Sequence, residues 1–197
     1  MIYLIRHGET VWNSERRMQG QADSPLTPRG LEQVRANAAT LAREIDDPGR
    51  FALVASPLGR AWQSAVIVAG GLGLDPRRIA FDDRLKEHSF GTLEGRTMDE
   101  IEAGDPGFWA RRAADHWNWQ APGGESYALL DRRVGAWLAE QTPGADLIVV
   151  CHGMVSRVLR GRYAGLAREE TLVLSESQDA LWRLDGGRIE TLVAGGG

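Results

Sequence analysis

The sequence has little of several features that would assign it to other classes of protein. Its 197 residues include one cysteine and one lysine. A single cysteine excludes an intrachain disulfide framework and a metal site built on a cysteine pair. The chain has 23 basic and 27 acidic residues, so it lacks the positive surplus typical of a nucleic-acid-binding face. No apolar run approaches the roughly 20 residues that a membrane-spanning helix needs.

The amino terminus also lacks the basic, apolar and small-residue segments of a secretory signal peptide. We therefore expect a cytoplasmic protein with neither a membrane nor a nucleic acid as its partner. Its four histidines, His7, His88, His116 and His152, show no metal-ligand spacing, so we expect no metal and no cofactor. The sequence leaves the oligomeric state open.

Short apolar runs alternate along the chain with stretches of helical periodicity. Strands are predicted at residues 2–5, 52–55, 79–81 and 147–151, and helices at 31–45, 58–68 and 127–141. Thr27 and Ser56, each followed by a proline, are the expected N-caps of the first two helices. This alternation predicts an α/β three-layer sandwich, in which helices cover both faces of a mostly parallel central sheet.

Two segments of the chain depart from this alternation. Runs at 180–184 and 188–193 flank Asp185-Gly186-Gly187, which predicts a C-terminal hairpin, and residues 195–197 are expected to fray. Residues at about 96–124 carry Trp109, Trp117 and Trp119. We interpret residues 1–197 as one domain and this segment as a small insertion over the active site, packed down by its tryptophans.

Three of the predicted strands end in polar residues suited to a phosphate. Arg6-His7-Gly8 follows the first, Ser56-Pro57-Leu58-Gly59-Arg60 the second, and His152-Gly153 the strand at 147–151. Ligands of parallel α/β sheets bind at the carboxyl ends of strands, where helix N-termini offer free N–H groups and a positive dipole end. Two arginines, two histidines and two helix starts can therefore converge on one pocket for a compact dianion.

Two further residues could take part in chemistry at this pocket. Hydrolysis of a phosphomonoester needs an acid for the leaving oxygen and a base for water, and one carboxyl can serve as both in turn. Glu87, after the third predicted strand, is the candidate, although most glutamates are solvated surface residues. Cys151 could be a thiol nucleophile, but a lone cysteine that ends an apolar strand is typical of a core.

Taken together, these segments resemble the signature of the histidine phosphatase superfamily, also called the phosphoglycerate mutase-like family. The motifs follow the family's order and cover nearly the whole chain. They are residues 4–10, Trp12-Asn13, Gln19-Gly20, 23–27, Gly30, 56–61, Glu87, Phe90-Gly91, Glu94-Gly95, 122–126 and His152-Gly153.

The resemblance implies a role for each matching residue. It implies that His7 is the nucleophile that becomes phosphohistidine, and that Glu87 is the proton donor and later the base for water. It implies a phosphate clamp of Arg6, Arg60 and His152. His7 must be neutral to attack, whereas His152 beside a dianion should favour its protonated form. The substrate-binding residues that it implies are Asn13, as a side-chain donor, with Gln19, Gly20, Gly153, Arg111 and Arg112.

The family contains phosphatases and cofactor-dependent phosphoglycerate mutases, and the sequence favours a phosphatase for a small phosphorylated metabolite. The resemblance places Met98 where those mutases carry a lysine for the substrate carboxylate. Arg111-Arg112, however, resembles an arginine pair that grips phosphoglycerate in mutases, and Arg96 could replace the lysine. Mutase activity is therefore the alternative. A non-catalytic binding protein would lack one of the catalytic residues, and all are present.

Overall fold

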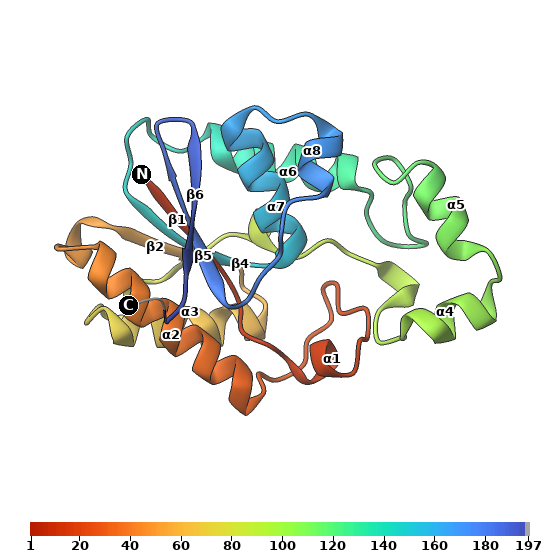
Figure 1. Cartoon of the computed structure of the whole chain (residues 1–197), viewed down its shortest axis with the longest axis horizontal. Coiled ribbons are helices and arrows are strands. Elements are labelled where there is room, and N and C mark those ends of the chain that lie inside the picture. The colour runs from red at the N-terminus through yellow and green to blue at the C-terminus, as the bar shows by residue number, and fades with distance from the viewer. Residues whose placement is uncertain (196–197) are drawn as a thin grey trace.

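The structure is a computed structural model that describes residues 1–195, and its centre is a six-stranded sheet between two layers of helices (Figure 1). The strand order is β3-β2-β4-β1-β5-β6. β3, β2, β4 and β1 are parallel, whereas β5 is antiparallel to β1 and forms an antiparallel pair with β6. The predicted α/β class, mostly parallel sheet and C-terminal hairpin are confirmed. The strands are β1 (Ile2–Arg6), β2 (Ala52–Ala55), β3 (Ala80–Phe81), β4 (Leu147–Cys151), β5 (Ala180–Asp185) and β6 (Arg188–Val193).

Helices cover both faces of the sheet, and shorter ones surround its carboxyl edge (Figure 1). One face is covered by α2 (Pro28–Glu44) and α3 (Gly59–Gly71), and the other by α6 (Tyr127–Ala139) and α7 (Gly153–Ala164). The remaining helices are α1 (Val11–Ser14), α4 (Met98–Gly104), α5 (Phe108–Ala114) and α8 (Arg168–Leu172). Single 3₁₀ turns are η1 (Pro48–Arg50), η2 (Pro76–Arg78), η3 (Asp83–Leu85) and η4 (Gly91–Leu93).

The central strands are apolar on both faces because each face is covered by helices. Side chains of a strand alternate between the faces. Leu4 of β1 therefore packs into the core with α6 and α7, while Tyr3 and Ile5 pack into the core with α2 and α3. Cys151 at the end of β4 is fully buried in the first of these cores, and burial raises the pKa of its thiol. It is thus a core residue, as expected.

The predicted start of α3 is wrong. Thr27 caps α2 as expected, since its Oγ1 accepts from Gly30 N at 3.0 Å. Ser56, in contrast, is not the N-cap of α3, which begins at Gly59 after Leu58. The Ser56 hydroxyl lies 2.7 Å from His152 Nε2. The same hydroxyl accepts from Leu58 N at 3.3 Å, so it contacts both His152 and the residue before α3 and does not cap the helix itself.

The segment predicted as an insertion contains two helices, α4 and α5, that the sequence analysis missed. They lie beside the carboxyl edge of the sheet (Figure 1). A local signal for α4 existed, because Thr97 and Glu100 form a capping box. The predicted packing of Trp109, Trp117 and Trp119 is confirmed, since all three contact the core on the α6–α7 side.

Two further expectations can be compared with the structure only over residues 1–195. The last two residues of the predicted frayed end, 196 and 197, lie outside them. Within residues 1–195, no helix is long and apolar enough to cross a membrane.

Candidate active site

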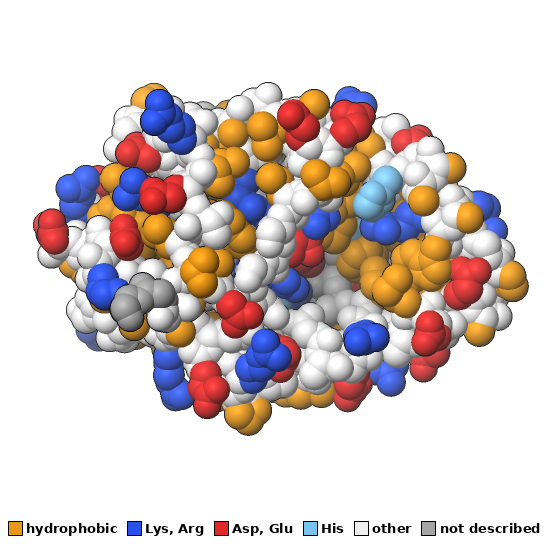
Figure 2. Space-filling view, viewed as in Figure 1, with side chains coloured by type: hydrophobic (Ala, Val, Ile, Leu, Met, Phe, Trp, Pro, Cys, Tyr) orange, Lys and Arg blue, Asp and Glu red, His pale blue; other side chains and the backbone are white. Residues whose placement is uncertain are grey.

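The parallel strands bring three polar strand ends to one edge of the sheet. His7 N donates to Cys151 O, and Ser56 N donates to Val150 O, each at 3.0 Å. The rings of His7 and His152 are consequently neighbours, with centroids 5.1 Å apart. Figure 2 shows that the surface is hollowed between the body of the sheet and the α4–α5 segment, with charged and hydrophobic side chains in the hollow.

His7 is held as a neutral imidazole with a defined tautomer. Its side chain is 2% exposed, and Nδ1 lies 2.8 Å from the carbonyl oxygen of Gly8. A carbonyl can only accept, so Nδ1 carries the proton and Nε2 has the lone pair. Burial, followed by the positive charges of Arg60 and Arg6, lowers the pKa of His7 well below its usual value. His7 Nε2 is therefore available as a nucleophile.

Arg60, on the first turn of α3, is buried directly beside that nitrogen. Its Nε donates to His7 Nε2 at 3.2 Å, which agrees with an unprotonated Nε2. Its other nitrogens donate to Gly20 O at 2.7 Å, to Ala22 O at 2.9 Å and to Asp23 Oδ1 at 3.1 Å. These acceptors hold a 1% exposed guanidinium in one orientation.

Glu87 lies at the N-terminus of α7, and it is buried. Its Oε2 accepts from Met154 N at 3.3 Å, and its Oε1 accepts from His88 N at 2.9 Å and Val155 N at 3.4 Å. Burial and then the charge of Glu176 raise the pKa of Glu87, against the His88 N–H, Arg60 and Arg6. A raised pKa suits a general acid that must still hold its proton near neutral pH.

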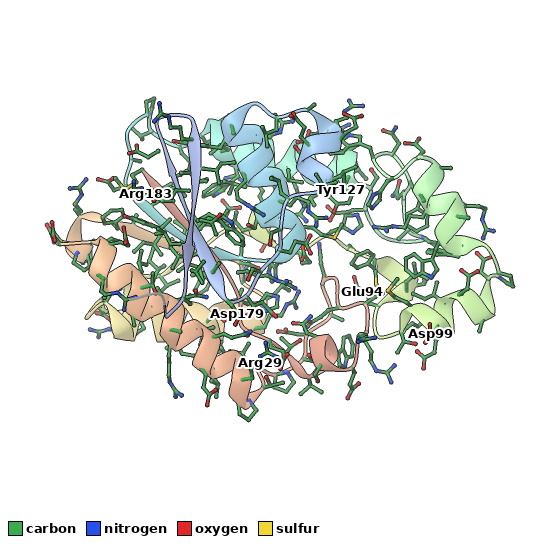
Figure 3. All side chains as sticks on the ribbon, viewed as in Figure 1. Arg29, Glu94, Asp99, Tyr127, Asp179 and Arg183 are labelled. Atoms are coloured by element: carbon green, nitrogen blue, oxygen red, sulfur yellow. The ribbon has the colours of Figure 1, made fainter. Side chains whose placement is uncertain are left out.

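Two charged side chains, Arg133 and Glu94, fix the backbone around Glu87. Arg133, on α6, pairs with Glu125 and donates to the carbonyl of Glu87 at 2.9 Å. Glu94 accepts from the backbone N–H groups of Gln21, Ala22 and Phe90 at 2.9 to 3.0 Å. Glu94 thereby ties the Gln19–Ser24 loop to the Glu87 loop, and Figure 3 shows it between the sheet and α4–α5.

His152, the residue before α7, is completely buried and contacts Ser56 through Nε2. Its Nδ1 has no hydrogen-bond partner among residues 1–195. Burial, then the charges of Arg60, His7 and Arg6, lower the pKa of His152 well below its usual value. The protein alone thus favours neutral His152, and a phosphate dianion is the group that would draw a proton onto it.

Arg6 stands at the end of β1 against the first turn of α7. Its Nη1 donates to the carbonyl oxygen of Glu176, and its buried Nε has no partner within the described chain. A Cβ on Gly153 would lie 3.3 Å from Arg6 Cζ and 2.9 Å from Glu176 Oε2. Glycine at position 153 thus allows α7 to approach both side chains.

Asn13 is linked to the backbone of His7 by Gln178, a residue that the sequence analysis missed. Gln178 Nε2 donates to Asn13 Oδ1 at 3.1 Å and to His7 O at 3.2 Å. Thr10 N also donates to Asn13 Oδ1, at 3.1 Å. Because these hydrogen bonds engage Asn13 Oδ1, the Nδ2 group remains as the side-chain donor that the sequence predicts.

Gln19 and Gly20 contribute to the protein's own network. The Gln19 amide accepts from Thr10 Oγ1 at 2.9 Å and donates to Ser24 Oγ at 3.2 Å. Gly20 has a φ of +55°, and a Cβ there would lie 2.2 Å from Glu94 Oε1. Its carbonyl orients Arg60. The contacts of both residues shape the site from the Gln19–Ser24 loop.

Arg112, on α5, lies over two indole rings on the inner side of the α4–α5 segment. Its Cζ is 5.8 Å from the ring centroid of Trp109 and 5.9 Å from that of Trp119. Burial lowers the pKa of Arg112, and the charges of Arg157 and Glu176 also act on it. Arg112 therefore lies near Glu176, whose carbonyl accepts from Arg6 and whose carboxylate lies against the first turn of α7.

Arg111 is not brought to the other predicted residues. Its guanidinium donates to Asp105 Oδ2 at 2.5 Å and to Pro106 O at 3.1 Å. These contacts hold it at the turn between α4 and α5, so the predicted arginine pair is separated. Consecutive helical residues point about 100° apart, which explains why the two guanidiniums make different contacts.

Together these residues can perform nucleophilic phosphoryl chemistry. They place an imidazole lone pair, a buried arginine, a second histidine and a carboxyl with a raised pKa at the carboxyl edge of the sheet, where α3 and α7 begin. Within residues 1–195, no group of three histidine, cysteine, aspartate or glutamate side chains could hold a metal ion. The sequence analysis missed Glu176, Gln178 and Arg133, which carry no motif and come from distant parts of the chain.

Comparison with known proteins gives a consistent family and mixed activity names. A model of the histidine phosphatase superfamily (branch 1) matches residues 2–185. A probable phosphoglycerate mutase, GpmB, from Salmonella paratyphi C is 36% identical over 202 residues, covering 96% of this chain and 91% of the relative.

Two of the solved structures that resemble the chain are named as phosphatases. An alpha-ribazole phosphatase from Shigella flexneri has a TM-score of 0.79 and 25% identity, covering 99% of this chain and 96% of the other. A mycobacterial glucosyl-3-phosphoglycerate phosphatase, in complex with VO3, has a TM-score of 0.77 and 26% identity, covering 98% and 96% of the two chains.

Proposed function

The chain belongs to the histidine phosphatase superfamily, branch 1, and is thus an enzyme of the phosphatase and mutase group; from this premise we propose that it hydrolyses the phosphomonoester of a small metabolite through a phosphohistidine. The observation that carries the proposal is the state of His7. Its Nδ1 proton is bound to Gly8 O, and its Nε2 lone pair faces Arg60 beside His152.

In the first half of the reaction, His7 Nε2 attacks phosphorus. The N–P bond forms, the P–O bond to the leaving group breaks, and Glu87 gives its proton to the leaving oxygen. In the second half, Glu87 takes a proton from water, whose oxygen attacks phosphorus. The N–P bond then breaks, so that phosphate leaves and neutral His7 is restored.

The phosphoryl oxygens would be bound by donors that are already oriented. Arg6 Nε, which has no partner among residues 1–195, and Asn13 Nδ2 would donate to these oxygens, and a protonated His152 would add a third donor. Arg60 would contribute its positive charge, since its nitrogens donate to His7 and to the Gln19–Ser24 loop. Each pre-oriented donor that meets the developing charge contributes on the order of 3 kcal/mol to transition-state stabilisation. The chain's own residues therefore account for the charge of the transferring group.

Hydrolysis differs from mutase activity in what reacts with phosphohistidine. A mutase must keep water out and hold a carboxylate-bearing acceptor while the phosphoryl group returns to it. Met98, at the place of the mutase lysine, is 51% exposed at the start of α4. The hollow between the sheet and the α4–α5 segment is open to solvent (Figure 2). Both features favour water as the acceptor.

The test is a comparison of phosphate release with phosphoryl exchange. We expect measurable phosphate release from several phosphomonoesters, because water reaches phosphorylated His7 before an organic acceptor does. We expect little exchange between 2- and 3-phosphoglycerate, even after addition of bisphosphoglycerate. Phosphate release is measured colorimetrically, and exchange is followed by ³¹P NMR. Exchange that outpaces release would show that the enzyme is a mutase.

We further propose that Arg112 binds an anionic group of the substrate outside the scissile phosphate. Arg112→Ala should lower kcat/KM for 3-phosphoglycerate about 10- to 100-fold, the value of one charge-assisted hydrogen bond. Its effect on β-glycerophosphate, which has no second anion, should stay within about threefold. Steady-state kinetics on both esters measure the difference.

Arg111→Ala is the matched control, since its guanidinium contacts Asp105 and Pro106 at the α4–α5 turn. It removes the same charge from the neighbouring position and should affect the two esters equally. If Arg111→Ala produces the selective loss and Arg112→Ala does not, the assignment of the arginines is reversed.

A further inference from the structure

Glu176 is a second carboxylate beside the catalytic residues, and the mechanism above does not use it. It lies in the loop between α8 and β5. Because β5 is antiparallel to β1, the loop that enters β5 meets the end of β1 at the sheet's carboxyl edge. There the carbonyl of Glu176 accepts from Arg6.

Arg157 holds the Glu176 side chain in this place. Arg157 Nη1 lies 3.2 Å from Glu176 Oε1 and donates to Tyr127 OH at 2.9 Å. Arg157 Nε donates to Leu174 O at 3.0 Å, which anchors the guanidinium to the same loop. Figure 3 shows Tyr127 on the α6 side, between the sheet and α5. Glu176 is therefore positioned by groups from α6, from α7 and from its own loop.

The carboxylates of Glu176 and Glu87 meet at the first turn of α7. Glu87 Oε2 accepts from Met154 N at 3.3 Å. Glu176 Oε2 lies 2.9 Å from the position that a Cβ of Gly153 would occupy. The two carboxylates thus contact adjacent residues of one helical turn. A carboxylate near another carboxyl group disfavours its ionisation, so the charge of Glu176 favours the proton on Glu87.

Some of the remaining groups around Glu87 lower its pKa, and others leave it unchanged or raise it. Arg6 from β1, Arg60 from α3 and the N–H groups of residues 88, 154 and 155 favour its carboxylate form. Tyr127 from α6 and Cys151 from β4 are buried, with raised pKa values, and remain neutral. Glu176 is thus the negatively charged side chain that opposes the two arginines, together with the burial that raises the pKa of Glu87.

We propose that Glu176 is a positioning residue for proton transfer: its charge, fixed by Arg157, keeps the proton on Glu87 until the leaving oxygen takes it. This inference rests on the proposed role of Glu87 as the acid. The enzyme then has a carboxyl pair with divided roles, since Glu87 exchanges the proton and Glu176 acts on it through space. Removal of the Glu176 charge should make Glu87 lose its proton at lower pH.

The first test is the pH dependence of kcat/KM in Glu176→Gln, which keeps the shape and removes the charge. With β-glycerophosphate, the fall of kcat/KM at high pH should move to lower pH by about 0.5 to 1 unit. With p-nitrophenyl phosphate, whose leaving group needs little protonation, the same limb should move far less. Glu176→Asp, which retains the charge, should restore most of the profile.

The matched control is Glu169→Gln, which removes one acidic charge from exposed α8 without reaching Glu87. Its profile should coincide with that of the unaltered enzyme on both esters. Equal shifts for the two esters in Glu176→Gln, or the same shift in Glu169→Gln, would overturn the inference, because neither outcome passes through the proton of Glu87.

The second test does not depend on catalysis. The side-chain carboxyl of Glu87 is titrated in the free protein by ¹³C NMR, with its resonance assigned by its loss in Glu87→Gln. Its midpoint should fall in Glu176→Gln and stay unchanged in Glu169→Gln; an unchanged midpoint in Glu176→Gln would overturn the inference. A lowered midpoint in a protein that releases no phosphate would uphold the coupling and reject the hydrolase proposal, so the two failures are distinguishable.

Discussion

His7→Ala should abolish the phosphoenzyme and lower phosphatase turnover by more than about 10,000-fold, the scale on which loss of a covalent nucleophile acts. His7 Nε2 is the nitrogen that carries the lone pair, since Nδ1 holds the proton bound to Gly8 O and Nε2 accepts from Arg60 Nε. Alanine leaves the arginines and His152 in place, so substrate should still bind. The measurement is rapid quench with ³²P-labelled substrate, followed by denaturation and peptide mapping.

The chemistry of the adduct makes this result specific. A phosphoramidate bond is labile in acid and stable in alkali, whereas phosphoserine and phosphothreonine survive acid. His116→Gln, a histidine replaced in the α5–α6 connection, should still acquire the label on His7. Label that survives acid, or that persists in His7→Ala, would rule out the phosphohistidine mechanism.

Glu87→Gln should lower turnover about 100- to 10,000-fold for alkyl phosphomonoesters, because the amide keeps the shape of the side chain and cannot supply the proton. The loss in the first turnover should be much smaller for p-nitrophenyl phosphate, whose leaving group departs without a proton. Stopped-flow release of nitrophenolate, beside quenched-flow assays of β-glycerophosphate, separates the two cases. Hydrolysis of the phosphoenzyme should remain slow with both, since Glu87 is also the base for water.

The pH dependence of the unaltered enzyme belongs to the same prediction. Burial and Glu176 raise the pKa of Glu87, so its acid form should persist to higher pH than that of an ordinary glutamate. First-turnover rates for alkyl esters should fall as the pH rises through this raised pKa. Glu169→Gln serves again as the control for loss of one acid. An equal loss for both kinds of ester in Glu87→Gln would mean that Glu87 only shapes the pocket.

Much of this protein follows from local features of the sequence. The apolar runs of β1 and β4 identify strands buried on both faces, and Thr27-Pro28 identifies the start of α2, because burial and capping act on neighbouring residues. One topological rule, that parallel strands end at the same edge of a sheet, predicts that Arg6-His7, Arg60 and His152 lie close together. The structure brings them together, with His7 and His152 5.1 Å apart.

Tertiary structure alone decided which side chains surround these residues. Local sequence assigned the Ser56 hydroxyl to a helix, but the adjacent strand places His152 within 2.7 Å of it. Arg111 and Arg112 are adjacent in sequence, yet they make different contacts. Arg111 contacts the α4–α5 turn, whereas Arg112 lies over the rings of Trp109 and Trp119.

Glu176 illustrates the same limit at the site itself. Glu176 lies 89 residues after Glu87 along the chain, and no motif surrounds it. The sequence by itself determined the strands and the main helices that cover the sheet, the motif residues and the kind of ligand they suit. The packing of distant loops determined the charge around Glu87, because electrostatic coupling depends on distance in space, and residue spacing along a folded chain does not specify that distance.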